Sequence, residues 1–216
     1  FDLYASMDPS KEVGGDFYDF FLIDDDHLAL LMADVSGKGV PAAIFMAVSR
    51  TLIRATGIRG AGAAECMTYS NNLLSKESVN SMFVTVFYGI YNIQTGEVTY
   101  ANAGHNPPYL MKANGTIEQL PLSKDIVAGA IDEYQYTDEK LQLEHGDTLL
   151  LYTDGVTEAT DADYGEYGEG RLEALLKQHT KDDCQQIIDK VKEDVKAFAG
   201  DVEQSDDITL LALRRK

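Results

Sequence analysis

Cysteine is scarce in this sequence. The 216 residues include only Cys66 and Cys184, which lie far apart and belong to neither a C-x-x-C motif nor a Cys/His cluster. This usage is typical of proteins in a reducing compartment. We therefore interpret both thiols as packing residues of a hydrophobic core.

Long hydrophobic runs are also missing. The longest strongly apolar stretch, residues 40–48, is far shorter than the roughly 20 residues that a membrane helix needs. No basic segment followed by an apolar one opens the chain, as a secretory leader would. We expect no membrane insertion of this domain and a cytoplasmic location.

Basic residues are few relative to acidic ones. There are 18 Lys and Arg against 36 Asp and Glu, which gives a formal net charge of -18. Such a surface repels phosphate backbones and anionic lipid headgroups, so we exclude nucleic acid as a partner. The excess of carboxylates is, however, what a site for hard divalent cations requires.

The length and the residue pattern indicate one α+β domain over residues 1–216. Residues 1–5 already read as part of a strand, so we interpret the chain as a piece of a longer polypeptide. A helix should follow Pro41, apolar all the way round and therefore buried, and further helices are expected at residues 63–75 and 184–198. Strands, mainly antiparallel, are expected at residues 17–23, 28–35, 82–91, 98–101, 148–153 and 208–213.

Four aspartates stand at the ends of these strands. Asp16 and Asp206 come just before strands, whereas Asp34 and Asp154 come at or just after the ends of others, each near glycine or another acid. In an antiparallel sheet the beginning of one strand lies beside the end of its neighbour, so all four can share one rim. Clustered carboxylates repel one another, but two divalent cations would balance their charge. Ligation by oxygen alone indicates two Mg²⁺ or Mn²⁺ ions.

The segments around these aspartates form a recognisable ordered set. They read VGGDFYD at residues 13–19, ADVSGKG at 33–39, NAGHNP at 102–107, TDGVTEA at 153–159 and DDIT at 206–209. Together they resemble the metal-dependent PPM protein phosphatases (protein phosphatase type 2C), in their bacterial SpoIIE/RsbU-like branch. The resemblance covers nearly the whole chain.

The resemblance implies a fold and an activity. The fold is a β-sandwich of two antiparallel sheets flanked by helices, with a two-metal centre. The activity is hydrolysis of phosphoserine or phosphothreonine in a protein, through attack by a water that bridges two metals. By motif match, Asp16, Asp34, Asp154 and Asp206 are the metal ligands, and the backbone carbonyl of Val35 adds another. Bacterial relatives commonly act on phosphorylated anti-sigma-factor antagonists and carry an N-terminal sensory domain, and we expect both of this chain; a homodimer is compatible with the sequence.

The chain departs from the animal-type pattern in one motif. Ser36 stands where those members carry a histidine proposed as general acid, so the proton donor is open. No arginine matches their phosphate-binding residue; Lys11 and Lys38 are alternatives, although a solvated lysine is the simpler interpretation of each. His105 could contact the site, or its role could be limited to the structure of the turn that contains it.

Two other functions remain open at this point. One is a phosphatase-like domain that no longer hydrolyses and serves as a binding or sensing module, although the motif aspartates are all present. The other is a phosphohydrolase of small molecules. Metalloprotease, Walker-loop and serine-hydrolase motifs are absent from the sequence.

Overall fold

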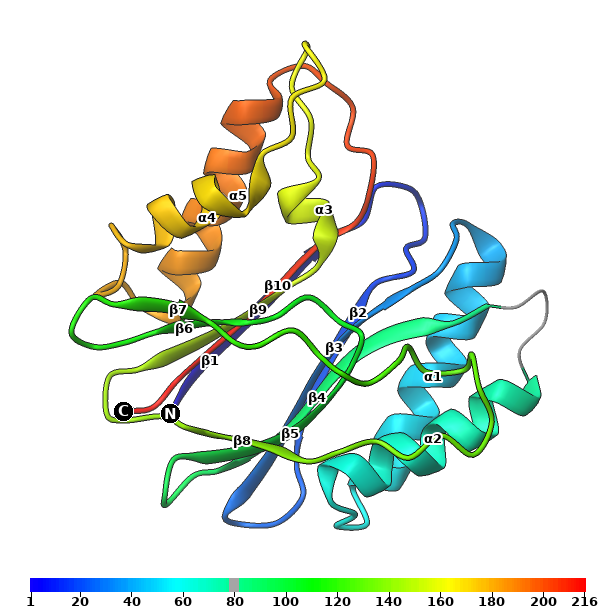
Figure 1. Cartoon of the computed structure of the whole chain (residues 1–216). Coiled ribbons are helices and arrows are strands. Elements are labelled where there is room, and N and C mark those ends of the chain that lie inside the picture. Colours follow the sequence, from blue (N-terminus) through cyan, green and yellow to red (C-terminus); the bar gives the residue numbers. More distant parts are fainter. Residues whose placement is uncertain (78–81) are drawn as a thin grey trace. The chain divides into compact units, whose positions relative to one another are not determined.

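The fold comes from a computed structural model, which describes residues 1–77 and 82–216. The chain divides into two compact units. Unit 1 comprises Phe1–Lys11, Asn106–Pro121 and Leu143–Lys216, and unit 2 comprises Glu12–His105 and Leu122–Gln142. Each unit contains one five-stranded antiparallel sheet and its own helices (Figure 1).

Unit 1 is built on a sheet whose strand order is β1-β10-β9-β6-β7. Its helix α5 packs against β1 and β10, because five residues at helical spacing turn an apolar face to that sheet: Cys184, Ile187, Ile188, Val191 and Val195. The elements are β1 (Asp2–Asp8), β6 (Tyr109–Met111), β7 (Ile117–Gln119), β9 (Thr148–Tyr152), β10 (Ile208–Arg214), α3 (Asp154–Thr157), α4 (Gly168–Leu176) and α5 (Cys184–Ala199).

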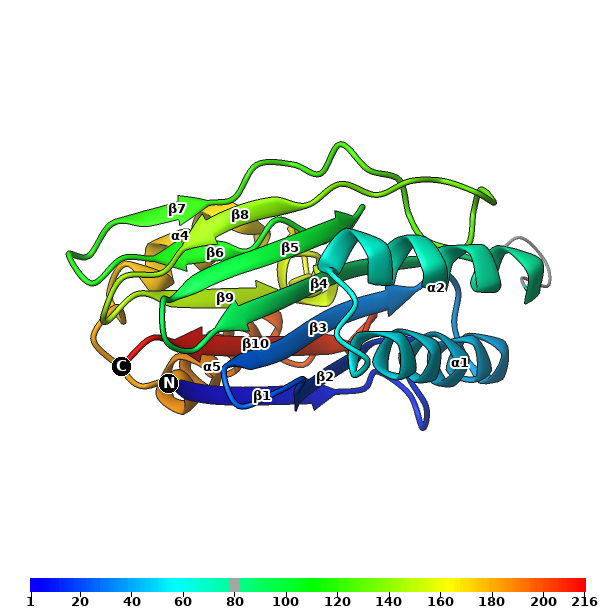
Figure 2. The ribbon, with the colours of Figure 1, turned by 90° about the horizontal axis from the view of Figure 1, so that it is seen from below.

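Unit 2 is built on a sheet whose strand order is β2-β3-β4-β5-β8. Helices α1 and α2 lie side by side along it (Figure 2). The buried core beneath them includes Ala29, Leu31 and Ala33 of β3, alternate residues that share one face of the sheet. The elements are β2 (Phe17–Leu22), β3 (His27–Val35), β4 (Val84–Asn92), β5 (Glu97–Ala103), β8 (Glu139–Gln142), α1 (Val40–Gly57) and α2 (Ala63–Glu77).

These elements confirm the predicted α+β class with two antiparallel sheets flanked by helices. The strands and helices expected from the sequence all occur, with ends that differ by a few residues. The short elements β6, β7, β8, α3 and α4 were not predicted, because each is brief and its pattern is not distinctive. Both cysteines are buried free thiols, and burial raises the pKa of each to about 12, which fits the packing role expected of them.

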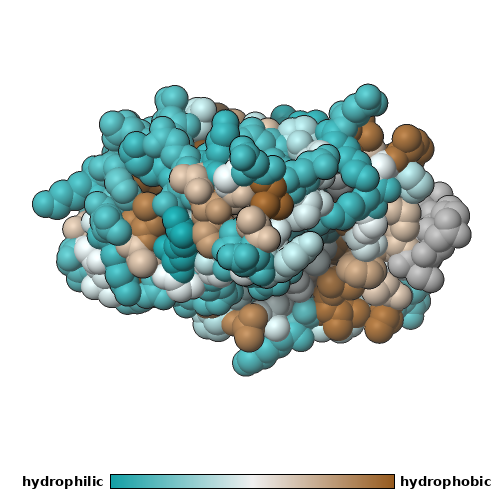
Figure 3. All heavy atoms as spheres, turned by 90° about the horizontal axis from the view of Figure 1, so that it is seen from above, coloured by the Kyte–Doolittle hydropathy of each residue, from teal (hydrophilic) through white to brown (hydrophobic). Residues whose placement is uncertain are grey.

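The prediction that the helix after Pro41 is buried all round is wrong for one face of α1. Val40, Ile44 and Val48, spaced at i, i+4 and i+8, are 65%, 62% and 38% exposed. The opposite face, with Ala42, Phe45 and Ile53, is buried. Figure 3 shows hydrophobic side chains gathered toward the right of that view, the side on which Figure 1 draws α1 and α2. No helix in the described part of the chain is long and apolar enough to cross a membrane.

Gly155 lies where two segments of unit 1 approach each other closely. It follows Asp154 at the start of α3, where the chain passes the segment leading into β10. A Cβ atom at this position would lie 2.0 Å from the carbonyl oxygen of Asp207 and 2.9 Å from its carbonyl carbon. Because that neighbour is backbone, a side chain at residue 155 would have to displace the segment that carries Asp206.

We predict that Gly155→Ala destabilises the fold, since the added methyl has no room. The expected loss is about 1–3 kcal/mol, seen as a melting temperature lower by roughly 2–4 °C per kcal/mol in thermal denaturation followed by circular dichroism. Gly170→Ala is the matched control, because nothing lies within 4 Å of its Cβ position in α4. Equal melting temperatures for Gly155→Ala and the wild type would contradict this account of the motif glycine.

Candidate metal and catalytic site

In unit 2 the first two predicted ligands stand on neighbouring strands. Strands β2 and β3 pair with Phe17 opposite Ala33, so the next position along the register sets Asp16 opposite Asp34. Residues directly opposite in an antiparallel pair have Cβ atoms roughly 4.5–5.5 Å apart. Asp16 is buried and Asp34 is half-buried. Two carboxylates in this relation repel each other, and a cation beside them would relieve the repulsion.

Gly15, directly before Asp16, allows a close passage of the backbone at the same point. A Cβ atom at Gly15 would lie 3.0 Å from the carbonyl oxygen of Val35. This carbonyl is the backbone ligand predicted from the motif match. Glycine therefore leaves the space around that oxygen clear of a side chain.

Ser36 has a structural use in this arrangement. Its backbone N–H donates to the Phe83 carbonyl oxygen at 2.9 Å, and its hydroxyl accepts the Phe83 N–H at 3.0 Å. These two bonds continue the β3–β4 pairing one step beyond Val35 and Val84. The serine hydroxyl thereby ties the turn after Asp34 to the start of β4.

A polar group lies behind Asp34 on strand β4. Thr85 is the cross-strand partner of Asp34, and its Oγ1 lies 3.5 Å from the Asp34 carbonyl oxygen and 2.9 Å from Nδ1 of His105. The His105 turn is closed by Asn102, whose side chain accepts the His105 N–H at 2.8 Å and donates to the His105 carbonyl oxygen at 3.1 Å. His105 is buried. Of the two alternatives for this histidine, the structural use in the turn is thus supported by direct contacts.

In unit 1 the other two predicted ligands lie beside the β9–β10 pair. Asp154 is the first residue of α3 and lies two residues after the end of β9, and Asp206 precedes β10 by two residues. Thr153 joins the two segments: its N–H donates to the Thr209 carbonyl oxygen at 3.1 Å, and its hydroxyl accepts the Thr209 N–H at 3.0 Å. The side chains of Asp154 and Asp206 are both half-buried.

The structure distinguishes the two adjacent aspartates of the last motif. Asp207 is buried, and its Oδ1 accepts hydrogen bonds from the backbone N–H and the hydroxyl of Ser10, at 2.7 and 3.1 Å. It therefore anchors the segment after β1. Gln204 donates to the carbonyl oxygens of Asp206 and Asp8, at 2.7 and 2.8 Å, which fixes the backbone beside the predicted ligand.

Sequence reasoning missed one ion-pair cluster next to the first motif. Asp19 in β2 is buried, and its Oδ1 accepts a hydrogen bond from Arg54 at 2.7 Å, while Nε of Arg50 lies 3.3 Å from Oδ2. Both arginines belong to α1, one turn apart, so they tie this helix to the strand that follows Asp16. The spacing of Arg50 and Arg54 on one helix face was the available signal, but the sequence does not show which acidic residue pairs with them.

The donor atoms suit a hard divalent cation. The predicted set contains carboxylates and one backbone carbonyl, which are the ligands that Mg²⁺ and Mn²⁺ prefer. Within the described residues, no group of three or more His, Cys, Asp or Glu side chains is placed to hold a metal ion. Lys11 and Lys38 both have exposed side chains.

Comparison with known proteins agrees with the motifs. The family model of Stage II sporulation protein E (SpoIIE) matches residues 24–216. The chain is 32% identical over 216 residues to the phosphoserine phosphatase RsbU of Bacillus subtilis (strain 168), a match that covers 100% of this chain and 63% of RsbU. The chain thus spans less than two thirds of that relative.

Solved structures show the same fold. The SiaA-PP2C domain of Pseudomonas aeruginosa superposes with a TM-score of 0.86 at 20% identity, covering 99% of this chain and 86% of that one. A structure of the PP2C phosphatase domain and a fragment of the regulatory domain of SpoIIE from Bacillus subtilis gives 0.85 at 19% identity, covering 99% and 62%. Because the SpoIIE model extends over most of the chain and the fold is that of PP2C domains, the chain belongs to the SpoIIE family of PPM-type phosphatases, as its aspartate motifs predict.

Proposed function

We propose that this domain is a metal-dependent phosphatase that hydrolyses phosphoserine or phosphothreonine in a protein substrate. The proposal rests on the membership of this chain in the SpoIIE family. It is supported by the similarity to RsbU, a relative named a phosphoserine phosphatase. The substrate class, a bacterial regulatory protein such as an anti-sigma-factor antagonist, rests on the family resemblance. The attached N-terminal regulatory region, the cytoplasmic location and a homodimer stay predictions of the sequence analysis.

The proposed metal ligands are Asp16, Asp34, Asp154 and Asp206 with the carbonyl oxygen of Val35. The single structural observation that favours them is the β2–β3 register, which sets a buried aspartate opposite a second one at a strand end. When bound, two divalent ions would neutralise the phosphate oxygens and lower the pKa of a water molecule that attacks phosphorus. We propose two Mn²⁺ or Mg²⁺ ions.

The chain's own residues have a clear part in this proposal. The strand ends hold the carboxylates rigidly, and Ser36, Thr85 and Gln204 fix the backbone on either side of them. Ser36 uses its hydroxyl to accept the Phe83 N–H, so we assign it to positioning and not to proton donation. The proton donor to the leaving group stays unassigned.

The first prediction of the proposed function is metal dependence. Purified protein should hydrolyse p-nitrophenyl phosphate and a phosphoserine peptide when Mn²⁺ or Mg²⁺ is supplied, and excess chelator should abolish both reactions, because the reaction depends on ions held only by carboxylates and one backbone carbonyl. Hydrolysis assays with added metal, with chelator, and with metal restored provide the measurement. Folded protein without turnover under any metal would support the inactive binding module, and faster hydrolysis of free phosphorylated metabolites would support the small-molecule enzyme.

The second prediction tests whether Asp34 and Asp154 are metal ligands. Asp34→Asn and Asp154→Asn should each lower kcat at least about a hundredfold, because each removes an anionic ligand with almost no change of side-chain size. Thermal denaturation should show that both variants stay folded. Asp163→Asn, in an exposed loop, is the matched control and should keep the wild-type rate. Wild-type kcat in either site variant would mean that the site lies elsewhere.

The third prediction concerns Ser36. Since its hydroxyl accepts a backbone hydrogen bond, Ser36→Ala should lower kcat by less than about tenfold, whereas loss of a general acid costs about 10²–10⁴-fold. The measurement is kcat on an aryl phosphate, whose leaving group is good, and on a phosphoserine peptide, whose leaving group is poor. A loss of about a hundredfold or more confined to the peptide would assign proton donation to Ser36.

A further inference from the structure

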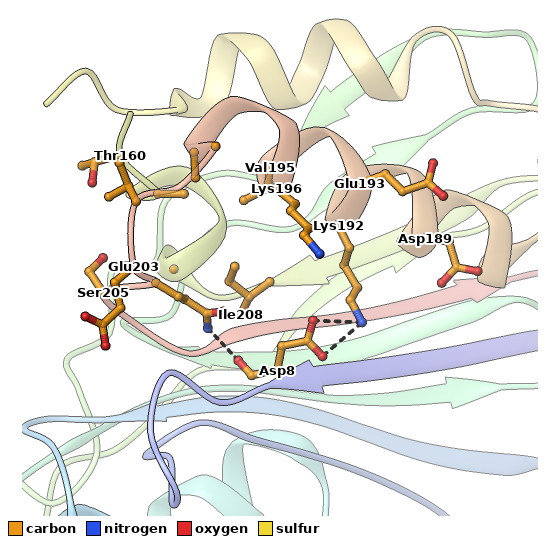
Figure 4. A pocket seen from close by; sticks show the side chains of 16 residues that line it. Asp8, Thr160, Asp189, Lys192, Glu193, Val195, Lys196, Glu203, Ser205 and Ile208 are labelled. Carbon is orange, nitrogen blue, oxygen red and sulfur yellow. Dashed lines mark hydrogen bonds and ion pairs between the residues drawn. The ribbon is translucent and has the colours of Figure 1, made fainter. Parts of the chain in front are cut away.

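Unit 1 contains a cavity of about 600 Å³ beside two of the proposed ligands, and we infer that it receives an apolar side chain of the polypeptide substrate, next to a carboxylate that pairs with Lys196 (Figure 4). The inference rests on the proposed function and specifies which phosphorylated polypeptides the domain prefers. The volume of the cavity falls within the range of roughly 300–1,000 Å³ that is typical of ligand pockets in proteins. The walls come from the end of α5, the segment 200–205 and the start of β10.

The position of the cavity argues for a substrate segment. Gly155, in its wall, directly follows Asp154, and Ser205, on another side, directly precedes Asp206. A polypeptide with its phosphate at those carboxylates would therefore have neighbouring residues close to the cavity. A phosphorylated side chain alone is small, so contacts outside the phosphate are where one polypeptide can be distinguished from another.

The lining is suited to an apolar group. It includes Val195, which is buried, and Val202, Ile208, Ala159 and Ala199, whose side chains are half-buried. These side chains give the cavity an apolar part into which an apolar group of a ligand can pack. Burying a side chain of the size of Leu or Phe contributes about 1.5–3 kcal/mol, which converts to roughly 10–150-fold in affinity.

The two lysines of the cavity have different surroundings. Lys192 is neutralised, because its Nζ lies 3.0 Å from Oδ2 of Asp8 and donates to the hydroxyl of Ser6 at 2.8 Å. Lys196 is one turn further along α5, and Figure 4 shows its ammonium group directed toward the cavity. No ion pair of Lys196 occurs in the part of the chain that the structure describes.

The charges around the rim limit which ligands fit. Asp189, Glu193 and Glu203 also line the cavity, and Glu193 is paired with Lys190 at 2.7 Å. A ligand with several negative charges would be repelled by these acids, whereas one carboxylate aimed at Lys196 would be attracted. This pattern favours a peptide that presents one apolar side chain with one acidic neighbour over a polyanion.

The test uses nine-residue peptides with phosphoserine at the centre and glycine elsewhere. One leucine is placed in turn at each other position, and an aspartate is then added beside the leucine of the best peptide. With Mn²⁺ present, the wild-type protein should show kcat/KM at least about tenfold higher for one leucine position than for the glycine peptide. The added aspartate should raise kcat/KM by roughly a further threefold or more.

Three variants test whether the preferences for leucine and for aspartate arise at this cavity. Ala199→Trp fills the cavity and should abolish the preference for leucine, whereas Val202→Ala enlarges it and should shift the preference toward phenylalanine. Lys196→Gln should remove only the gain from aspartate. Lys177→Gln is the matched control, since Lys177 directly follows α4 and pairs with Glu173 at 2.6 Å, outside the cavity, and it should keep both preferences.

The outcomes separate this inference from the proposed function. Equal kcat/KM for all peptides, or a leucine preference that survives both Ala199→Trp and Val202→Ala, would overturn the inference while leaving the phosphatase in place. Hydrolysis of no peptide by the wild-type protein under any metal would overturn the proposed function and the inference with it.

Discussion

The repulsion between two adjacent carboxylates is the constraint on which the rest of this account depends. The β2–β3 register sets Asp16 opposite Asp34, with Asp16 buried at the beginning of its strand. Burial and a like-charged neighbour both disfavour the ionised form of such a pair. Cations bound beside the pair would remove this cost, which is why we propose a metal-dependent chemistry for it.

The surroundings of the proposed ligands have one property in common: their backbone is fixed by groups that are not ligands. Ser36 and Thr85 hold the end of β3 against β4, and Asp207 holds the segment before β10 through Ser10. Glycine is used where a backbone carbonyl passes closely, at Gly15 and Gly155. Rigid placement of this kind is what catalysis by charge requires, since a misplacement of about 1 Å can cost roughly a hundredfold in rate.

The strand-end positions of the proposed ligands could be predicted from the sequence, because strand ends, acidic residues and glycines are visible in it. The position of Asp34 at the end of an apolar strand and of Asp206 before another needed only the periodicity of the residues. The partners of Asp19 and Asp207 were not predictable, since they depend on contacts between residues distant in the chain, such as Ser10 and Asp207. The exposed face of α1 was also missed, because an apolar helix pattern does not reveal which faces the fold will cover.

The central claim is that Asp16, Asp34, Asp154 and Asp206 bind divalent cations. The most direct test is an anomalous difference map from crystals of this domain grown with Mn²⁺, recorded above the manganese absorption edge. Our account predicts two peaks at about 2.0–2.3 Å from carboxylate oxygens of these aspartates, with the Val35 carbonyl oxygen among the ligands. Manganese bound to other side chains, with these four carboxylates making no contact to it, would contradict the account.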